Sequence, residues 1–231
     1  WQDSTVFEAV VLSVMGADGY KKALVDLDNG ALTGPEMIKS LTELKKVASY
    51  MDPDGKGQDW NLEAAKVING KAGMQIMGDW AKSEWTAAKK VAGKDYECVA
   101  FPGTDKAFTY NIDSLAVFKQ KDAGTAAGQQ DIAKVVLGED FQKVFSINKG
   151  SIPVRLDVPL ERYDSCAKLS NKDLKSSASK RTLLPSFSHA MAMEPQVSGA
   201  VYDVVTNYFN ASAMTAEKAA SELATAIKAA L

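Results

Sequence analysis

Helical patterns far outnumber strand patterns in this chain. Apolar residues recur at helical spacing through most of its length, as Val10 and Val14 do near the start. Strand-like alternation is confined to short segments at 74–76, 97–101 and 112–118. A complete doubly wound sheet in 231 residues needs more strands than these. The sequence therefore predicts an α/β fold with an excess of helix that is part of a larger architecture.

Turn and capping residues mark where the helices begin and end. The first helix is expected over 5–15, ending near Gly16. Thr33 and Glu36 have the spacing of a capping box, which predicts the start of a second helix. Further helices are expected over 61–68 with Asn61 as cap, over 81–92, on both sides of Gly138, within 164–181, and in two C-terminal segments, the last capped by Thr215.

Charge and hydropathy exclude several classes of protein. Lys and Arg number 27 against 29 Asp and Glu, a net charge of −2, which disfavours nucleic-acid binding because such domains carry clustered positive charge. No apolar run approaches the roughly 18 residues that span a bilayer. Residue 1 is Trp and no signal-peptide pattern follows it, so we expect a processed chain or a fragment.

Sequence motifs of common catalysts and cofactor sites are absent. The chain has no P-loop, no dinucleotide-binding glycine motif, no zinc-protease motif and no nucleophile elbow. His189 is the only histidine, so a catalytic triad or a multi-histidine metal site would have to include it. We therefore predict no catalytic residue, no metal site and no cofactor.

The cysteines, Cys98 and Cys166, lie far apart in the sequence. This is not the spacing of a zinc site, which needs closely spaced Cys and His pairs. The residues alone leave two alternatives open, which are a pair of buried thiols or one disulfide in an oxidising compartment.

Aromatic and polar residues stand at the breaks between the expected elements, where ligand-binding groups are commonly presented. A sugar needs this mix of residues. Carboxylates and amides accept from its hydroxyls, cationic groups donate to them, and a flat ring covers the apolar face of the pyranose. The candidates are Trp60, Trp80, Asn111, Asp113, Lys149 and His189.

Each candidate also has an ordinary structural interpretation. A Trp after a strand commonly packs in a core, and a single loop histidine is commonly structural. Asp113 can cap a turn, and Lys149 can face solvent at a helix C-terminus. Trp1 and Trp85 are assigned to packing.

One segment favours the sugar-binding interpretation of these residues over the structural one. Asn69–Trp80, NGKAGMQIMGDW, resembles the G-x-A-x-M-x-x-x-G-x-W segment of periplasmic solute-binding proteins of carbohydrate ABC transporters. Later segments agree in order and spacing, namely Phe101-Pro-Gly, Glu139–Arg155 with its G-x-x-P-x-R turn, and the helix that starts at Thr215. The glucose/mannose-binding branch is most similar, on the initial WQDSTVFE and on Asp113, Lys149 and His189.

This resemblance implies a type II periplasmic-binding-protein fold and a binding protein rather than an enzyme. It implies that a monosaccharide, with glucose expected, is captured between two lobes and delivered to the membrane components of an ABC importer. Trp80 would stack on the sugar, Asp113 would bond its hydroxyls, Lys149 and His189 would donate to it, and Trp60 and Asn111 would be weaker contacts. The oxidising periplasm favours a Cys98–Cys166 disulfide.

The resemblance also implies how the chain divides into lobes. Residues 1–111 would belong to the second lobe, 112–165 would be a return segment of the first lobe, and 166–231 would supply the crossover and C-terminal helices of the second lobe. The N-terminal part that builds most of the first lobe has no counterpart here, so we expect a C-terminal portion whose partner is that missing part. A return segment without its sheet would expose apolar surface.

Two other interpretations remain open on the residues alone. A carbohydrate-active enzyme needs two carboxylates about 5 to 10 Å apart across the sugar, and Asp79 with Asp113 is the obvious pair. The other is a helical interaction module that binds no small ligand.

Overall fold

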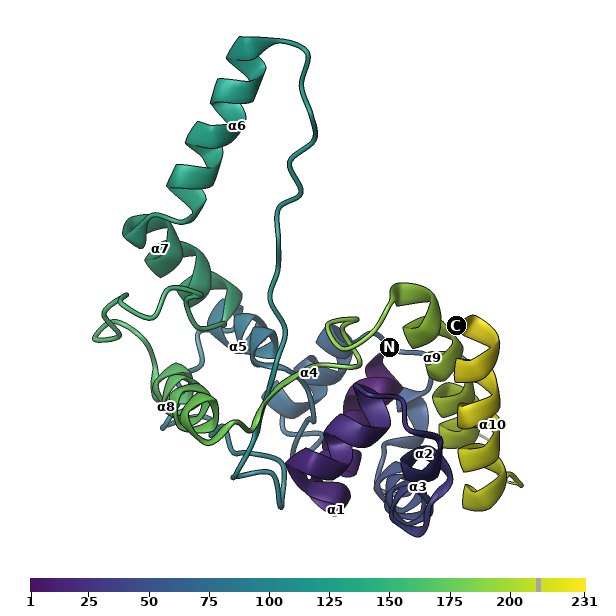
Figure 1. Ribbon diagram of the computed structural model, residues 1–231. Helices are drawn as coiled ribbons and strands as arrows, with labels where there is room; N and C mark the ends of the chain where they lie inside the picture. The colour runs from purple at the N-terminus through teal and green to yellow at the C-terminus, as the bar shows by residue number, and fades with distance from the viewer. Residues whose placement is uncertain (211–212) are drawn as a thin grey trace. The chain divides into compact units, whose positions relative to one another are not determined.

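The structure, a computed structural model, describes residues 1–210 and 213–231 and is a helix-rich α/β fold with a small sheet (Figure 1). Its longer helices are α1 (Gln2–Leu24), α3 (Pro35–Ala48), α6 (Ala123–Val136), α7 (Glu139–Lys149), α8 (Ser165–Lys180), α9 (Pro195–Asn210) and α10 (Ala216–Ala230). Shorter elements are α2 (Asn29–Thr33), η1 (Pro53–Gly55), α4 (Trp60–Ile68), η2 (Asp79–Ala81), α5 (Lys82–Ala87), β1 (Phe108–Tyr110) and β2 (Leu183–Pro185).

The chain divides into two compact units. Unit 1 consists of Trp1–Gly78, Val99–Asn111 and Lys172–Leu231, and unit 2 consists of Asp79–Cys98 and Ile112–Asn171. The units share with the sequence-based division a boundary after Asn111, and they differ from it in grouping residues 79–98 with 112–171. The lobe assignment itself stays a prediction.

Unit 1 holds the larger hydrophobic core. Helices α1, α3, α9 and α10 each bury one apolar face, and Figure 1 shows α9 and α10 side by side. Phe7, Leu41, Tyr208 and Leu223 are among its fully buried side chains. Each such large side chain contributes about 1.5–3 kcal/mol when it is buried away from water. Burial of this core therefore stabilises the fold of unit 1.

The sheet differs from the sequence-based expectation. β1 pairs in parallel with β2, with Phe108 opposite Leu183. The segments at 74–76, 97–101 and 112–118, which were predicted as strands, are not strands here. Alternating β-branched and aromatic residues favour extended backbone, but a strand also needs a neighbour that accepts its ladder hydrogen bonds. Within the described residues, no such neighbour pairs with these segments.

Glycines and capping residues set the helix ends as the sequence suggests, with corrections. Gly16 has a φ of 66° and interrupts α1, which then continues to Leu24. Thr33 and Glu36 do not form a capping box, because Thr33 ends α2 by donating to Asn29 O and Gly34 takes the N-cap position of α3.

Three further helix expectations can be compared with the structure. The cap predicted at Asn61 is wrong, since α4 starts at Trp60 with Asp59 as its N-cap. The helix predicted over 81–92 is shorter than expected and ends at Ala87. The cap at Thr215 is confirmed, because its hydroxyl accepts from Lys218 N at 3.2 Å.

Unit 2 has a small core and a covalent clamp. Val158, Tyr163 and Ala167 form its buried cluster, and a disulfide joins Cys98 to Cys166. The disulfide confirms the pairing that the resemblance implied. None of the helices in the described part of the chain is long and apolar enough to cross a membrane.

Unit 2 also exposes much apolar surface. The chain runs extended from Ile112 to Phe118 before it enters α6, as the teal segment of Figure 1 shows, and α6 has no buried residue. Leu115, Val117 and Phe118 are each at least 65% exposed. The apolar surface expected of the return segment 112–165 is therefore present.

Candidate functional site

The C-terminus of α7 brings Lys149 next to η2. Gly150 ends α7 in a left-handed conformation with a φ of 88°, which glycine adopts without the steric cost of a Cβ. A Cβ at Gly150 would lie only 2.8 Å from the carbonyl oxygen of Asp79 and 3.0 Å from Lys82 Cβ. A glycine is thus required both by the turn and by the close approach of the two backbones.

Three charged groups meet at this point of unit 2. Lys149 forms an ion pair with Asp113, whose side chain is 59% exposed against 29% for Lys149. Burial lowers the pKa of Lys149, and the negative charge of Asp79 opposes that shift. The arrangement offers ammonium donors and carboxylate acceptors within one small volume.

Asp79, the third member of this group, is partly buried. Burial raises the pKa of its carboxyl, while the positive charges of Lys82 and Lys149 act in the opposite direction. Its carboxylate also accepts hydrogen bonds from the backbone N–H groups of Trp80 and Ile152. Asp79 thereby ties η2 to the loop after α7, which fixes the backbone that carries Trp80.

The two tryptophans of unit 2 differ in their surroundings. Trp80 is the central residue of η2 and is partly exposed. Trp85 is 8% exposed and packs against Tyr96 with ring centroids 5.5 Å apart, so its assignment to packing is confirmed. Trp80 is therefore the more exposed of the two tryptophans of this unit.

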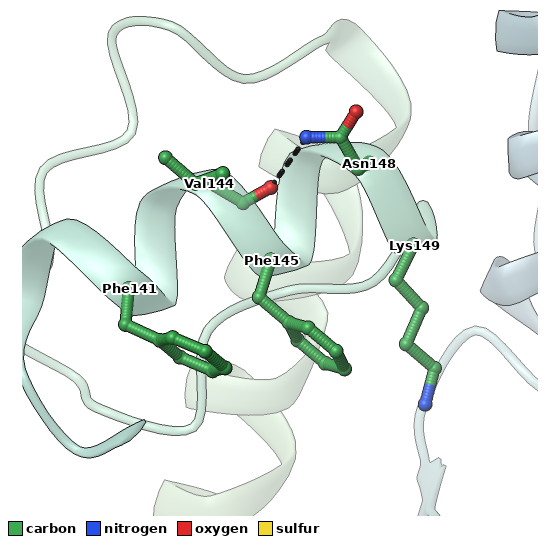
Figure 2. A pocket seen from close by; sticks show the side chains of 5 residues that line it. All are labelled: Phe141, Val144, Phe145, Asn148 and Lys149. Atoms are coloured by element: carbon green, nitrogen blue, oxygen red, sulfur yellow. Dashed lines mark hydrogen bonds between the residues drawn. The ribbon is translucent and has the colours of Figure 1, made fainter. Parts of the chain in front are cut away.

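A shallow hollow of about 390 Å³ adjoins Lys149 on α7 (Figure 2). Phe141, Phe145 and Lys149 point to the same side of the helix, and the two phenyl rings stack with centroids 5.4 Å apart. The Asn148 amide turns back to donate to Val144 O at 2.7 Å. The hollow is walled mostly by carbon, so it suits an apolar neighbour better than a sugar.

In unit 1, His189 lies at the end of a turn held by a buried carboxylate. Glu8 of α1 is 5% exposed and accepts from Phe187 N at 2.8 Å and from Ser188 N at 3.1 Å. The hydroxyls of Ser186 and Ser188 each lie 2.8 Å from its Oε1. Burial is the main cause that raises the pKa of Glu8, and these hydrogen bonds oppose it.

The histidine ring is partly buried and held on several sides. Its Nδ1 lies 2.9 Å from the Oγ atoms of Ser186 and Ser188. Trp1 meets it edge to face at 5.6 Å, although Trp1 itself is 43% exposed. Burial and the positive N-terminus lower the pKa of His189 to about 4, so the imidazole is neutral at pH 7.

The remaining candidates are also in unit 1. Trp60 begins α4, is partly exposed, and its carbonyl accepts from the Gln75 side chain at 2.7 Å. Asn111 follows β1 directly and is exposed. The sequence-predicted candidates thus fall into two sets, with Trp80, Asp113 and Lys149 in unit 2 and Trp60, Asn111 and His189 in unit 1.

Residues that were not predicted as sugar contacts complete these sets. Asp79 and Gly150 position Lys149 and Trp80, and Glu8 with its serines positions His189. The DW pair in NGKAGMQIMGDW and the glycine directly after Lys149 were visible signals for the first two. Nothing local in the sequence marks Glu8, because its backbone partners Phe187 and Ser188 lie about 180 residues away.

No protein-family model matches the chain. It is 45% identical over 230 residues to a probable sugar-binding periplasmic protein of Rhizobium meliloti (strain 1021), a match that covers 100% of this chain and 55% of the relative. A protein of the same name from Brucella suis is also 45% identical, with 54% of it covered. An uncharacterised ABC transporter extracellular-binding protein of Pyrococcus horikoshii is 31% identical over 99% of this chain.

A solved structure of a Streptococcus pneumoniae solute-binding protein in complex with the blood group A-trisaccharide superimposes with a TM-score of 0.69. It is 16% identical and covers 97% of this chain and 57% of that one, so it establishes the fold alone. The chain is homologous to solute-binding proteins. The resemblance and the fold class predicted from the sequence are confirmed.

This solute-binding-protein homologue spans about half the length of the curated relatives it matches. Those relatives are named as binding proteins, in agreement with the prediction that the chain is not an enzyme. Their names agree with the predicted periplasmic location. Within residues 1–210 and 213–231, no group of three or more His, Cys, Asp or Glu side chains could hold a metal ion.

Proposed function

We propose that the chain is the C-terminal portion of a periplasmic protein that captures a monosaccharide, with glucose as the expected sugar, and delivers it to an ABC importer. The observation that carries this proposal is the pairing of Lys149 with Asp113 beside Asp79 and Trp80. The names of relatives at 45% identity over 230 residues support a sugar as the ligand.

The chemistry of the unit 2 set suits a polyhydroxylated ring. Each sugar hydroxyl both donates and accepts, so it can bond to the Asp113 carboxylate and the Lys149 ammonium together. The indole of Trp80 would cover the apolar C–H face of the ring. For unit 1, taken by itself, Trp60, Asn111 and His189 are the proposed sugar contacts.

We further propose that residues 112–165 are a return segment of the first lobe, with 1–111 and 166–231 forming the second lobe. The exposed apolar side chains between Ile112 and Leu156 support this assignment, because a surface of this kind is normally covered. The occupant would be the part of the longer protein that the relatives possess beyond the matched half. The apolar hollow on α7 belongs to the same uncovered surface.

Calorimetric titration of the 231-residue chain with D-glucose tests the function. Lys149→Gln should weaken binding by at least about tenfold, because it removes a charged hydrogen bond to the sugar. Lys143→Gln is the matched control, since Lys143 lies on the same helix and pairs with Glu139. Equal affinities for the two variants would refute the assignment of Lys149, and an absence of heat with every monosaccharide would refute the proposed function of this chain.

A further inference from the structure

Lys82, the first residue of α5, carries a buried positive charge in unit 2. Its side chain is 7% exposed, whereas the side chain of Lys149 is 29% exposed. The Lys82 ammonium donates to both carboxylate oxygens of Asp164, at 3.0 and 3.1 Å. A buried charge that lacks a partner is costly, so this ion pair fixes where the ammonium lies.

The backbone around Lys82 is also held in place. Asp164 Oδ1 accepts from Ala167 N at 2.7 Å, which ties the ion pair to the first turn of α8. Lys82 Cβ lies against the end of α7, where a Cβ added at Gly150 would be 3.0 Å from it. The position of Lys82 is therefore set by the ends of two helices.

The charge of Asp79 is balanced mainly by Lys82. Burial raises the pKa of the Asp79 carboxyl, and the positive charge of Lys82 opposes this shift more strongly than the charge of Lys149 does. A nearby positive charge favours the ionised form of a carboxylate. In the described part of the chain, Lys149 forms its ion pair with Asp113 and none with Asp79. Lys82 thus leaves the Lys149 ammonium for Asp113.

The loss of the Lys82 charge would change this arrangement. Opposite charges attract more strongly where water is scarce, and Asp79 is partly buried whereas the Asp113 side chain is 59% exposed. An Asp79 carboxylate without Lys82 would therefore attract the Lys149 ammonium away from Asp113. The flexible four-carbon stem of lysine permits such a turn.

We propose that Lys82 is a positioning residue of the sugar site, which balances the charge of Asp79 and so keeps Lys149 paired with Asp113, where a sugar hydroxyl can meet both groups. The inference rests on the proposed function, in which Lys149 and Asp113 bind the sugar. Lys82 acts through Asp79 and is not itself a ligand contact. Removing the charge of Lys82 should weaken sugar binding, and removing the charge of Asp79 as well should restore it.

Crystal structures of the 231-residue chain and of its Lys82→Gln variant, both without sugar, test the positioning directly. Glutamine keeps a hydrogen-bond donor for Asp164 and removes the charge. In the variant, Lys149 Nζ should lie within hydrogen-bond distance of the Asp79 carboxylate and should have left Asp113. An unchanged Lys149–Asp113 pair would overturn the proposal.

Calorimetric titration with D-glucose tests the consequence for binding. Lys82→Gln should weaken binding by at least about tenfold, and Lys82→Gln combined with Asp79→Asn should recover most of the lost affinity. Lys143→Gln is the matched control, because it removes a cation of α7 that pairs with Glu139, and it should bind as the wild type does. A double variant that binds no better than Lys82→Gln would overturn the action through Asp79.

Hydrogen exchange of the α7 amides separates this role from a loss of folding. A loss of protection in Lys82→Gln that Asp79→Asn reverses would support the charge balance, whereas a loss that it does not reverse would overturn it. No heat with glucose, mannose or galactose in the wild-type chain would refute the proposed function. The two crystal structures would then still decide whether Lys82 positions Lys149.

Discussion

Replacing Cys98 and Cys166 together by alanine should destabilise unit 2 by about 4 kcal/mol and leave unit 1 almost unchanged. Both cysteines belong to unit 2, and 68 residues separate them in the sequence. The buried cluster of unit 2 is small, with Val158, Tyr163 and Ala167 as its buried members. The crosslink therefore matters more there than it would in the larger core of unit 1.

The magnitude follows from the entropy of the unfolded chain. Closing a loop of 68 residues removes about 15 cal/mol/K from the unfolded ensemble in the chain-entropy model. At 25 °C this amounts to about 4 kcal/mol, which is close to a thousandfold change in the opening equilibrium. Ala is the better replacement, because a serine hydroxyl at the buried Cys166 position would add a desolvation cost of its own.

Hydrogen exchange read by mass spectrometry resolves the two units. Amides of α7 and the first turn of α8 should exchange up to about a thousandfold faster in the double variant, whereas amides of α1, α3, α9 and α10 should not. The matched control is the wild-type chain in a thiol reductant, which should reproduce the variant's pattern. The variant should not respond to the reductant.

Equal loss of protection in both units would refute this reasoning, because it would mean that the units open together. A loss below about 1 kcal/mol would also refute it, since the crosslink would then constrain little of the unfolded chain.

Two further predictions concern the turn after α7 and the neutral histidine. Gly150→Ala should lower the free energy of unfolding of unit 2 by about 2 kcal/mol or more, because Gly150 has a positive φ and an added Cβ would meet the Asp79 carbonyl oxygen. Gly128→Ala in α6, where nothing lies near the added Cβ, should raise the free energy of unfolding by up to about 1 kcal/mol. Urea unfolding measures both changes, and the same sign for both variants would contradict the account. His189 has a pKa of about 4 when folded. Its unfolded pKa is about 6.5, so the unfolded state binds the extra proton between these values and stability falls as the pH drops through that window. After discounting for its partial exposure, we expect wild type to lose about 2 kcal/mol more than His189→Gln between pH 7 and pH 4 by urea unfolding, and parallel pH profiles would contradict this.

The sequence predicted the helices best where breaks and apolar stripes agree. Gly138 separates α6 from α7, and Thr215 caps α10, as expected. These signals are local, since a cap or a break acts through backbone groups a few residues away. The box at Thr33 failed because α2 immediately precedes α3 and uses Thr33 in its own last turn.

The strands were predicted poorly because pairing is not local. The segment 112–118 has the composition of a strand, yet its backbone groups find no ladder partner among the described residues. β1 and β2 pair across about 75 residues of chain, which no short-range pattern reveals. β-propensity describes a surface that packs well on a neighbour, and the neighbour is set by the whole fold.

The candidate site also contains features that local sequence predicts and features that depend on distant contacts. Trp80, Asp113 and Lys149 were found from a motif and its family resemblance, and the structure pairs Asp113 with Lys149. The role of Glu8 could not be predicted, since it depends on a contact between α1 and a turn near the other end of the chain. The kinds of side chain in the site were predictable from the sequence, but the hydrogen-bond surroundings of His189 depend on contacts that only the fold creates.

The central claim is that Trp80 lies at a sugar-binding surface, and a titration of the tryptophan indole N–H signals by proton–nitrogen NMR tests it most directly. D-glucose should shift the Trp80 signal saturably and leave that of Trp85, which is packed against Tyr96, in place. Trp80→Phe assigns the signal. Contradiction would come from glucose, mannose and galactose all leaving the Trp80 signal unmoved at saturating concentrations.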